Sequence, residues 1–325
     1  MGRCRMALVL VEHQDGHPDE LSLQALALAR GVTEEAPLEA LLIGPGATDA
    51  ANELGAHGVT TAHVAEDDRL GAYAPAAWAR CITEVAESTN PAAIVAAGSN
   101  RGNEVLAHVA ARMDLPFAAN CTKASADGTV TRVRWGGSLL EEARLHGSPL
   151  LLSCAPHAVQ PATTNGAATP ALQPFEPTLT ESDLTVQVKE RVQAETKGIS
   201  LAEAKVVISG GRGVGSADGF AILEELAGLL GAAVGCSRVV TMAGWRPHTD
   251  QVGQTGTKVS PDLYIACGIS GATQHIAGCK GAKKILAINS DAEAPILNNA
   301  DYAVIGDLTE IVPAITEELK RERSG

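Results

Sequence analysis

Small and polar residues follow the β-like apolar runs in the second half of the chain. Gly210-Gly211-Arg212-Gly213 follows the run at 205–209, and Gly235-Cys236-Ser237-Arg238 follows the short run at Val234. Glycines allow a backbone to approach phosphate groups closely, and an arginine can neutralise the charge of a pyrophosphate. These residue types therefore favour a phosphate-containing ligand such as a dinucleotide.

The later apolar runs end on residues of the same kinds. Gly268-Ile269-Ser270-Gly271 follows the third run, Asn289 follows the fourth and Asp307 follows the last. The carboxyl ends of parallel strands share one edge of a sheet, because right-handed crossovers return every strand in the same direction. We therefore expect all these residues to converge on one rim, where Asn289 and Asp307 can hydrogen-bond an adenosine.

The first glycine-rich loop matches neither of two familiar phosphate motifs. No Gly-Lys pair followed by Ser or Thr is present, so it is not a Walker A loop. Ser216 stands where the third glycine of the dinucleotide fingerprint belongs. Taken alone, this loop is also compatible with an ordinary turn between a strand and a helix, and only the convergence of the other strand ends favours a ligand.

A long polar loop punctuated by glycine lies between the second and third apolar runs. It covers residues 244–261 and contains Gln251, Gln254 and Thr255. Loops of this length inside a compact domain are uncommon and tend to carry function, although a solvated surface excursion is the alternative. The loop is therefore a candidate functional segment.

The first half of the chain alternates apolar runs with amphipathic stretches. Strands are predicted at 7–11, 38–43, 60–64 and 92–97, with helices near 21–29, 47–54, 75–88 and 103–113. Repeated β-α units of this length predict a mostly parallel sheet covered on both faces. Asp127-Gly128 predicts a hairpin turn, and hence an antiparallel addition to that sheet.

The chain between the two halves has a different composition. Residues 160–180 are rich in Pro, Thr, Ala and Gly without periodicity, which indicates an irregular crossing. A strand-like run at 184–192 is predicted to return to the first sheet.

The second half repeats the β-α alternation. Strands are predicted at 205–209, around 234, at 263–267, 285–288 and 302–305, with helices at 217–230, 272–278 and 308–318. Together the two halves predict an α/β fold of two doubly wound, mostly parallel sheets, in domains 1–196 and 197–325.

The composition of the 325-residue chain excludes several classes of protein. Its net charge of −13 and its 3% aromatic content argue against binding of nucleic acid or anionic lipid. The apolar run at 6–11 is too short for a signal-peptide core, and no stretch approaches the ~18 apolar residues of a membrane span. Seven widely spaced cysteines without metal-site spacing indicate reduced thiols, so we expect a cytoplasmic protein without a metal site or membrane insertion.

Several motifs in the second half occur together in one known family. Leu263–Asn289 contains Leu-Tyr-Ile, Gly-Ile-Ser-Gly, Gln-His and Ala-Ile-Asn. It is accompanied by Ser209–Gly213, Ser237-Arg238, Gln251–Gly256, and Ala300–Tyr302 with Gly306–Leu308. In this order and at these distances the motifs resemble the electron transfer flavoprotein α-subunit family. The first half fits that family in length, in layout and in its opening strand, which ends Val-Glu-His at 11–13.

The resemblance implies a Rossmann-like FAD-binding domain at 197–325 and a heterodimer with an electron transfer flavoprotein β subunit, which binds AMP. Residues 1–196 would contact that partner. The flavin would relay electrons from acyl-CoA dehydrogenases of fatty acid β-oxidation, and from other dehydrogenases, to a membrane electron transfer flavoprotein:quinone oxidoreductase. The protein would then be an electron carrier with a redox-active FAD rather than an enzyme with its own substrate.

The resemblance also implies roles for individual residues. Arg212, Ser237 and Ser270 would meet the pyrophosphate, and Asn289 and Asp307 the adenosine. Gln254 and Thr255 would lie along the flavin, with the Thr255 hydroxyl near N5, while His275 would donate to the C2 carbonyl and Arg238 would lie beside the ring system. A donor at the C2 carbonyl stabilises the reduced flavin, because reduction places negative charge on N1 and on this oxygen. The complete set of implied cofactor contacts is Arg212, Ser237, Arg238, Gln251, Gln254, Thr255, Gly268, Ser270, Gly271, Gln274, His275, Asn289 and Asp307.

Two other functions remain open from the residues alone. One is an NAD-dependent dehydrogenase with the dinucleotide in the same cleft, and the other is a non-redox nucleotide-binding subunit. The interrupted dinucleotide fingerprint, and the lack of an acidic residue placed for a ribose at a following strand end, disfavour the dehydrogenase. Val214-Gly215-Ser216 after the Gly-Gly-Arg-Gly motif, and Thr273 before Gln-His, depart from the family pattern but remove no implied ligand.

Overall fold

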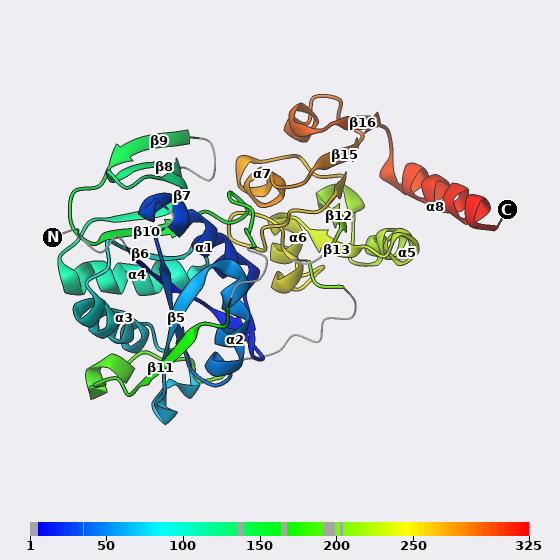
Figure 1. Ribbon diagram of the computed structural model, residues 1–325. Coiled ribbons are helices and arrows are strands. Elements are labelled where there is room, and N and C mark those ends of the chain that lie inside the picture. Colours follow the sequence, from blue (N-terminus) through cyan, green and yellow to red (C-terminus); the bar gives the residue numbers. More distant parts are fainter. Residues whose placement is uncertain are drawn as a thin grey trace. The chain divides into compact units, whose positions relative to one another are not determined.

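The computed structural model describes residues 6–34, 36–134, 139–163, 168–190, 199–201 and 204–324. The chain divides into two units, Met1–Arg191 and Val192–Gly325, and each has its own main sheet (Figure 1). The domain boundary that the sequence predicts between 196 and 197 lies outside the described residues. None of the described helices is long and apolar enough to cross a membrane.

The first unit contains a nine-stranded sheet in the order β11-β5-β4-β1-β6-β10-β7-β8-β9. The strands from β11 to β7 are parallel, and β7, β8 and β9 pair antiparallel. A two-stranded hairpin, β2 (His13–Gln14) with β3 (His17–Pro18), follows β1. The strands of the large sheet are β1 (Ala7–Leu10), β4 (Leu38–Ile43), β5 (Val59–Ala65), β6 (Ala93–Ala97), β7 (Phe117–Ala124), β8 (Thr129–Arg134), β9 (Leu139–Arg144), β10 (Leu150–Cys154) and β11 (Ala171–Phe175).

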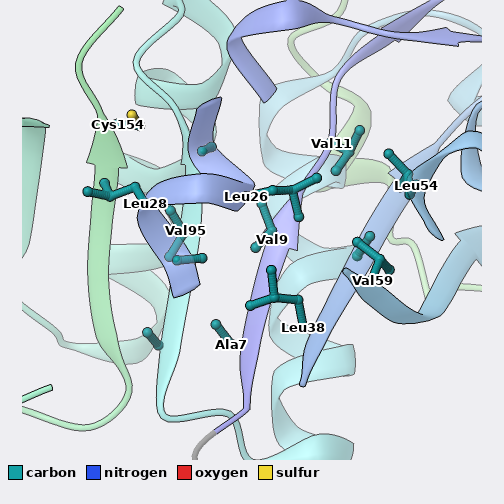
Figure 2. Close-up of a cluster of buried hydrophobic side chains, with 14 of the residues drawn as sticks. Ala7, Val9, Val11, Leu26, Leu28, Leu38, Leu54, Val59, Val95 and Cys154 are labelled. Atoms are coloured by element: carbon teal, nitrogen blue, oxygen red, sulfur yellow. The ribbon is translucent and has the colours of Figure 1, made fainter. Parts of the chain in front are cut away.

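Helices cover both faces of this sheet. One face packs against α1 and α2, and the other against α3 and α4. Figure 2 shows the first of these two cores, where Val9 of β1, Leu26 of α1 and Val95 of β6 meet. The central strands are apolar at almost every position because both of their faces are buried. The helices are α1 (Glu20–Thr33), α2 (Ala47–Glu53), α3 (Pro75–Thr89) and α4 (Asn100–Met113).

The four strands and four helices predicted between residues 7 and 113 are confirmed, whereas two later predictions for the first unit are wrong. The hairpin at Asp127-Gly128 is confirmed, since β7 and β8 pair antiparallel on either side of it. The irregular crossing predicted for 160–180 instead contains β11, an exposed edge strand that includes Pro174. Edge strands tolerate proline and need no apolar alternation, so this strand gives little signal in the sequence.

The second error concerns the strand predicted at 184–192. No strand occurs in its described part, 184–190, and residues 191–192 lie outside the described residues. β11 already pairs with the outer edge of β5, so that edge cannot take another strand. A Thr180–Asp183 capping box starts a short 3₁₀ turn there, and Val186 beyond it is 64% exposed.

The second unit contains five parallel strands in the order β13-β12-β14-β15-β16. α5 and α8 pack on one face, whereas α7 and the loop that carries Val252 pack on the other. The predicted strands and helices are confirmed, although the helix predicted at 217–230 begins as a separate 3₁₀ turn. The elements are β12 (Val206–Gly210), α5 (Ala221–Leu230), β13 (Ala233–Cys236), α6 (Arg238–Met242), β14 (Leu263–Cys267), α7 (Thr273–Cys279), β15 (Lys284–Asn289), β16 (Tyr302–Ile305) and α8 (Leu308–Ser324).

The strand order of the second unit reverses beside β12. The chain passes from β12 outward to β13, then returns across β12 to β14. Connections on the two sides of such a reversal diverge and leave a crevice at the carboxyl ends of the strands, which is where open α/β sheets bind ligands. We therefore expect a ligand site between the segments that follow Gly210 and Cys267.

Candidate functional site

A cleft of about 390 Å³ lies at the carboxyl edge of the second unit's sheet. Segments that follow each of the five strands contribute to its wall, and its size is typical of a small-molecule site. Six of the implied cofactor contacts, Arg212, Ser237, Gly268, Ser270, Asn289 and Asp307, are brought together here. The other lining residues are Gly213, Val239, Ser290, Asp291, Ala294 and Leu308.

Three side chains on the cleft wall have donors that form no hydrogen bond with any described residue. Arg212 is exposed and has no ion-pair or hydrogen-bond partner among the described residues. Ser237 is the N-cap residue of α6 but makes no side-chain cap bond. The Ser270 hydroxyl is exposed and likewise has no partner in the described part of the chain. These donors come from three different strand ends, so they can surround one anionic group.

Asn289 and Asp307, in contrast, already organise the rim. The Asn289 amide nitrogen donates to the Ile269 carbonyl at 2.8 Å, and its oxygen accepts from the Asp291 N–H at 3.0 Å. Asp307 accepts from the backbone N–H and the hydroxyl of Thr309, and these donors lower the pKa of its carboxyl group. Each side chain keeps an unused lone pair or N–H, so each can still contact a ligand.

Glycines let the two central loops of the cleft pack backbone against backbone. The Gly213 N–H donates to the Gly268 carbonyl at 3.1 Å, and a Cβ on Gly211 would lie 2.2 Å from that same oxygen. Gly268 has a φ of +62°, a conformation that residues with side chains rarely adopt. The loops therefore form a narrow floor of backbone without side chains, which a phosphate group can approach closely.

A second group of implied contacts assembles away from the lining of this cleft. Gln251 is 2% exposed, and its amide nitrogen donates to the Thr255 hydroxyl oxygen at 3.0 Å, while its oxygen accepts from Thr241. The Gln254 N–H donates to the Gln274 carbonyl at 2.7 Å. The long loop is thereby fixed to the start of α7, and the exposed Thr255 keeps its own proton for another acceptor.

His275 belongs to this second group and is buried. Its Nε2 lies 2.8 Å from the hydroxyl oxygen of Tyr264, and its Nδ1 has no hydrogen bond of good geometry among the described residues. Burial lowers the pKa of His275 to about 4, and the Val252 backbone offsets this only in part. His275 is therefore neutral at physiological pH. It is not among the residues that line the cleft.

The remaining implied contacts, and some residues that sequence reasoning missed, lie near the first group. Arg238 is exposed at the start of α6, next to Ser237. Ser290 and Asp291 line the cleft directly after Asn289, so the strand-end rule could have found them had it been applied two residues further. Burial raises the pKa of Cys236 and Cys267 to about 12, so neither thiol is a nucleophile.

Family comparisons agree with this geometry. Residues 7–180 match the electron transfer flavoprotein domain, and residues 200–280 match the electron transfer flavoprotein FAD-binding domain. The chain is 35% identical over 320 residues to the electron transfer flavoprotein subunit alpha of Bacillus subtilis, with 98% of each chain covered. The chain belongs to the electron transfer flavoprotein α-subunit family.

Other α subunits align over similar lengths. The α subunit of Mycobacterium tuberculosis is 37% identical over 318 residues, which cover 97% of this chain and 98% of that protein. A protein from Clostridium saccharobutylicum named FixB is 34% identical over 320 residues, which cover 96% of this chain and 95% of that protein. Membership of the electron transfer flavoprotein family supports an electron-transfer role and an FAD-binding second unit.

The residues of the second unit fit an FAD. The glycine-walled floor admits a phosphate group, and Arg212, Ser237 and Ser270 supply unused donors around it. His275 supplies a buried nitrogen without a partner in the described structure. The donor set is made of oxygen and nitrogen groups suited to a dinucleotide rather than to a metal ion.

The buried state of His275 predicts a pH-dependent stability for the second unit. An unfolded histidine has its pKa near 6.5, and the folded pKa is about 4, so the unfolded chain binds more protons between these values. Stability should therefore be fully present above pH 6.5 and fall as pH decreases. Between pH 7 and pH 5 the loss from this group is about 2 kcal/mol.

Urea unfolding of wild type and His275→Gln at both pH values would measure this loss. Trp78→Phe and Trp135→Phe leave Trp245 as the fluorescent reporter of the second unit. The free energy of unfolding of wild type should drop by about 2 kcal/mol more than that of His275→Gln. Parallel pH profiles would show that His275 protonates as freely in the folded chain as in the unfolded one.

Proposed function

We propose that this chain is the FAD-carrying α subunit of a heterodimeric electron transfer flavoprotein. It would accept electrons from acyl-CoA dehydrogenases and other dehydrogenases, including those of fatty acid β-oxidation, and deliver them to a membrane quinone oxidoreductase. The observation that carries this proposal is the convergence of three unused donors, Arg212, Ser237 and Ser270, on one cleft within the family's FAD-binding domain.

The two groups of residues divide the cofactor between them in this proposal. Arg212, Ser237 and Ser270 bind the pyrophosphate, and Asn289 and Asp307 receive the adenosine. The loop and α7 hold the flavin end, where Thr255 has a free proton and His275 is a neutral side chain. Bound FAD supplies the electron-accepting ring, and the protein binds, orients and tunes it.

The rest of the flavin contacts follow the same division. Gln251 donates to the Thr255 hydroxyl oxygen and so fixes Thr255, and its second amide N–H is still available to the cofactor. Gln254 and Gln274 are exposed beside Thr255 and His275, and Arg238 follows Ser237. Gly268 and Gly271 contribute the backbone conformations that place Ser270.

A β subunit that binds AMP completes the proposed heterodimer, with residues 1–196 as the main contact. Exposed large apolar side chains support the need for a partner, because an exposed apolar patch is often covered by another protein. Leu139 and Leu140 on β9, the edge strand of the first unit, are 53% and 72% exposed. A cytoplasmic location is supported by the six free cysteines in the described part of the chain.

An absorbance spectrum with a dithionite titration tests the proposal. The chain would be purified alone and together with its β partner, each with added FAD. The complex should show a bound, reducible flavin, and the chain alone should hold FAD more weakly. A complex that stays colourless with FAD, or that binds NADH saturably without flavin, would refute the carrier function and favour the nucleotide-binding or dehydrogenase alternatives.

A further inference from the structure

The hydroxyl of Tyr264 and the imidazole of His275 form a buried pair beneath the long loop. Tyr264 is fully buried on β14, and its oxygen lies 2.8 Å from Nε2 of His275 on α7. Ser209 of β12 is also fully buried, and its hydroxyl forms no hydrogen bond of good geometry in the described structure. A neutral imidazole has one N–H, so the direction of the bond to Tyr264 decides what the other nitrogen offers.

The hydrogen bonds of the described residues fix that direction. The Tyr264 hydroxyl has no hydrogen bond of good geometry with a described residue other than His275, so its proton has no other acceptor there. Burial also raises the pKa of Tyr264 well above its usual value, so the phenol stays protonated. A buried hydroxyl that donated to nothing would lose the free energy of a hydrogen bond, so the bond runs from Tyr264 to Nε2 of His275.

We propose that Tyr264 is a positioning residue that donates to Nε2 of His275 and thereby keeps the His275 proton on Nδ1. Nε2 is then occupied by the bond from Tyr264, and Nδ1–H, which forms no hydrogen bond of good geometry with a described residue, is the group that His275 can offer to a ligand. A flavin carbonyl is an acceptor, so this tautomer attracts it and the other tautomer repels it. This inference rests on the proposed function only for the identity of that ligand.

The long loop is in direct contact with α7, the helix that carries His275. A Cβ on Gly278 of α7 would lie 2.2 Å from the backbone nitrogen of Gly253, so the loop and the helix pack backbone against backbone. This contact fixes the position of α7 and so supports the bond between His275 and Tyr264.

Nitrogen NMR of the histidine ring tests the first half of the proposal without any cofactor. The full chain labelled with ¹⁵N-histidine would be compared with His275→Gln to assign the ring signals. Wild type should show His275 as the neutral Nδ1–H tautomer, and Tyr264→Phe should show a mixture of tautomers. A wild-type Nε2–H tautomer, or an unchanged tautomer in Tyr264→Phe, would overturn the proposal.

The midpoint potential of FAD in the complex with the β subunit tests the second half. Tyr264→Phe should weaken the stabilisation of reduced FAD by about tenfold, which is about 59 mV for one electron, while FAD affinity stays unchanged. Thr316→Val is the matched control, because it removes a buried hydroxyl of the same unit that donates to the Val312 carbonyl and is absent from the cleft lining. An unchanged potential in Tyr264→Phe would overturn the positioning role.

The two measurements separate this inference from the function on which it rests. A complex that binds no flavin refutes the proposed function, and the NMR spectrum of the same chain still decides the tautomer. If Tyr264→Phe does not fold, the wild-type spectrum alone decides whether Nδ1 carries the proton.

Discussion

Arg212→Ala should weaken FAD binding by about 10- to 100-fold, the loss expected when one charge-assisted contact to a phosphate is removed. Arg212 is exposed on the cleft wall, and no described residue forms an ion pair with it. Its removal should therefore cost cofactor affinity and leave the stability of the apo chain unchanged. Equilibrium titration of the apo complex with FAD, followed by flavin fluorescence, measures the dissociation constant.

Two further variants make this test specific. Arg321→Ala removes the same charge from the distant surface of α8, where Arg321 pairs with Glu318, and it should leave FAD affinity unchanged. Arg212→Lys keeps the charge but loses the planar fork, so its affinity should lie between those of wild type and alanine. Equal dissociation constants for wild type and Arg212→Ala would show that Arg212 does not contact the phosphates.

Gly271→Ala should destabilise the second unit by about 3 kcal/mol, because it combines a forbidden backbone conformation with a steric clash. Gly271 has a φ of +86°, and a Cβ there would lie 2.2 Å from the backbone nitrogen of Ile296. That N–H donates to the Ser270 carbonyl at 3.0 Å, so the substitution should also displace Ser270 and weaken FAD binding.

Hydrogen–deuterium exchange of the β14 and β15 peptides measures the stability of the second unit separately from the first. These strands should exchange faster in Gly271→Ala. Gly228→Ala is the matched control, because the Cβ would meet nothing within 4 Å on the helix α5, where alanine should stabilise by about 0.5–1 kcal/mol. Unchanged exchange in Gly271→Ala would mean that the rim accommodates a side chain without strain.

The sequence predicts most of the fold because both sheets are built from local β-α units with apolar periodicity. The strand β14, for example, is predicted with its observed bounds, since Leu263–Cys267 is a continuous apolar run. β11 could not be predicted, because its pairing with β5 depends on a long-range backbone contact and its side chains are exposed. The small hairpin of β2 and β3 is too short to leave a periodic signal.

The sequence also predicts which residues meet at the cleft, through the rule that carboxyl ends of parallel strands share an edge. It does not predict how each residue is engaged. Asn289 and Asp307 bind the backbone of the rim, while the Ser237 and Ser270 hydroxyls form no hydrogen bond within the described part of the chain. The burial of His275 against Tyr264 depends on packing between α7 and β14, which residue spacing does not encode.

The edge strand β11 has a consequence for how the first unit is made on the ribosome. β5 is complete at Ala65, but the residues that pair with it, 171–175, are synthesised much later. Until then the outer edge of β5 presents free N–H and C=O groups, to which the same strand of another nascent chain can pair. A shortened first unit that ends before Phe175 would therefore aggregate edge to edge, and production of this unit by itself must extend through that residue.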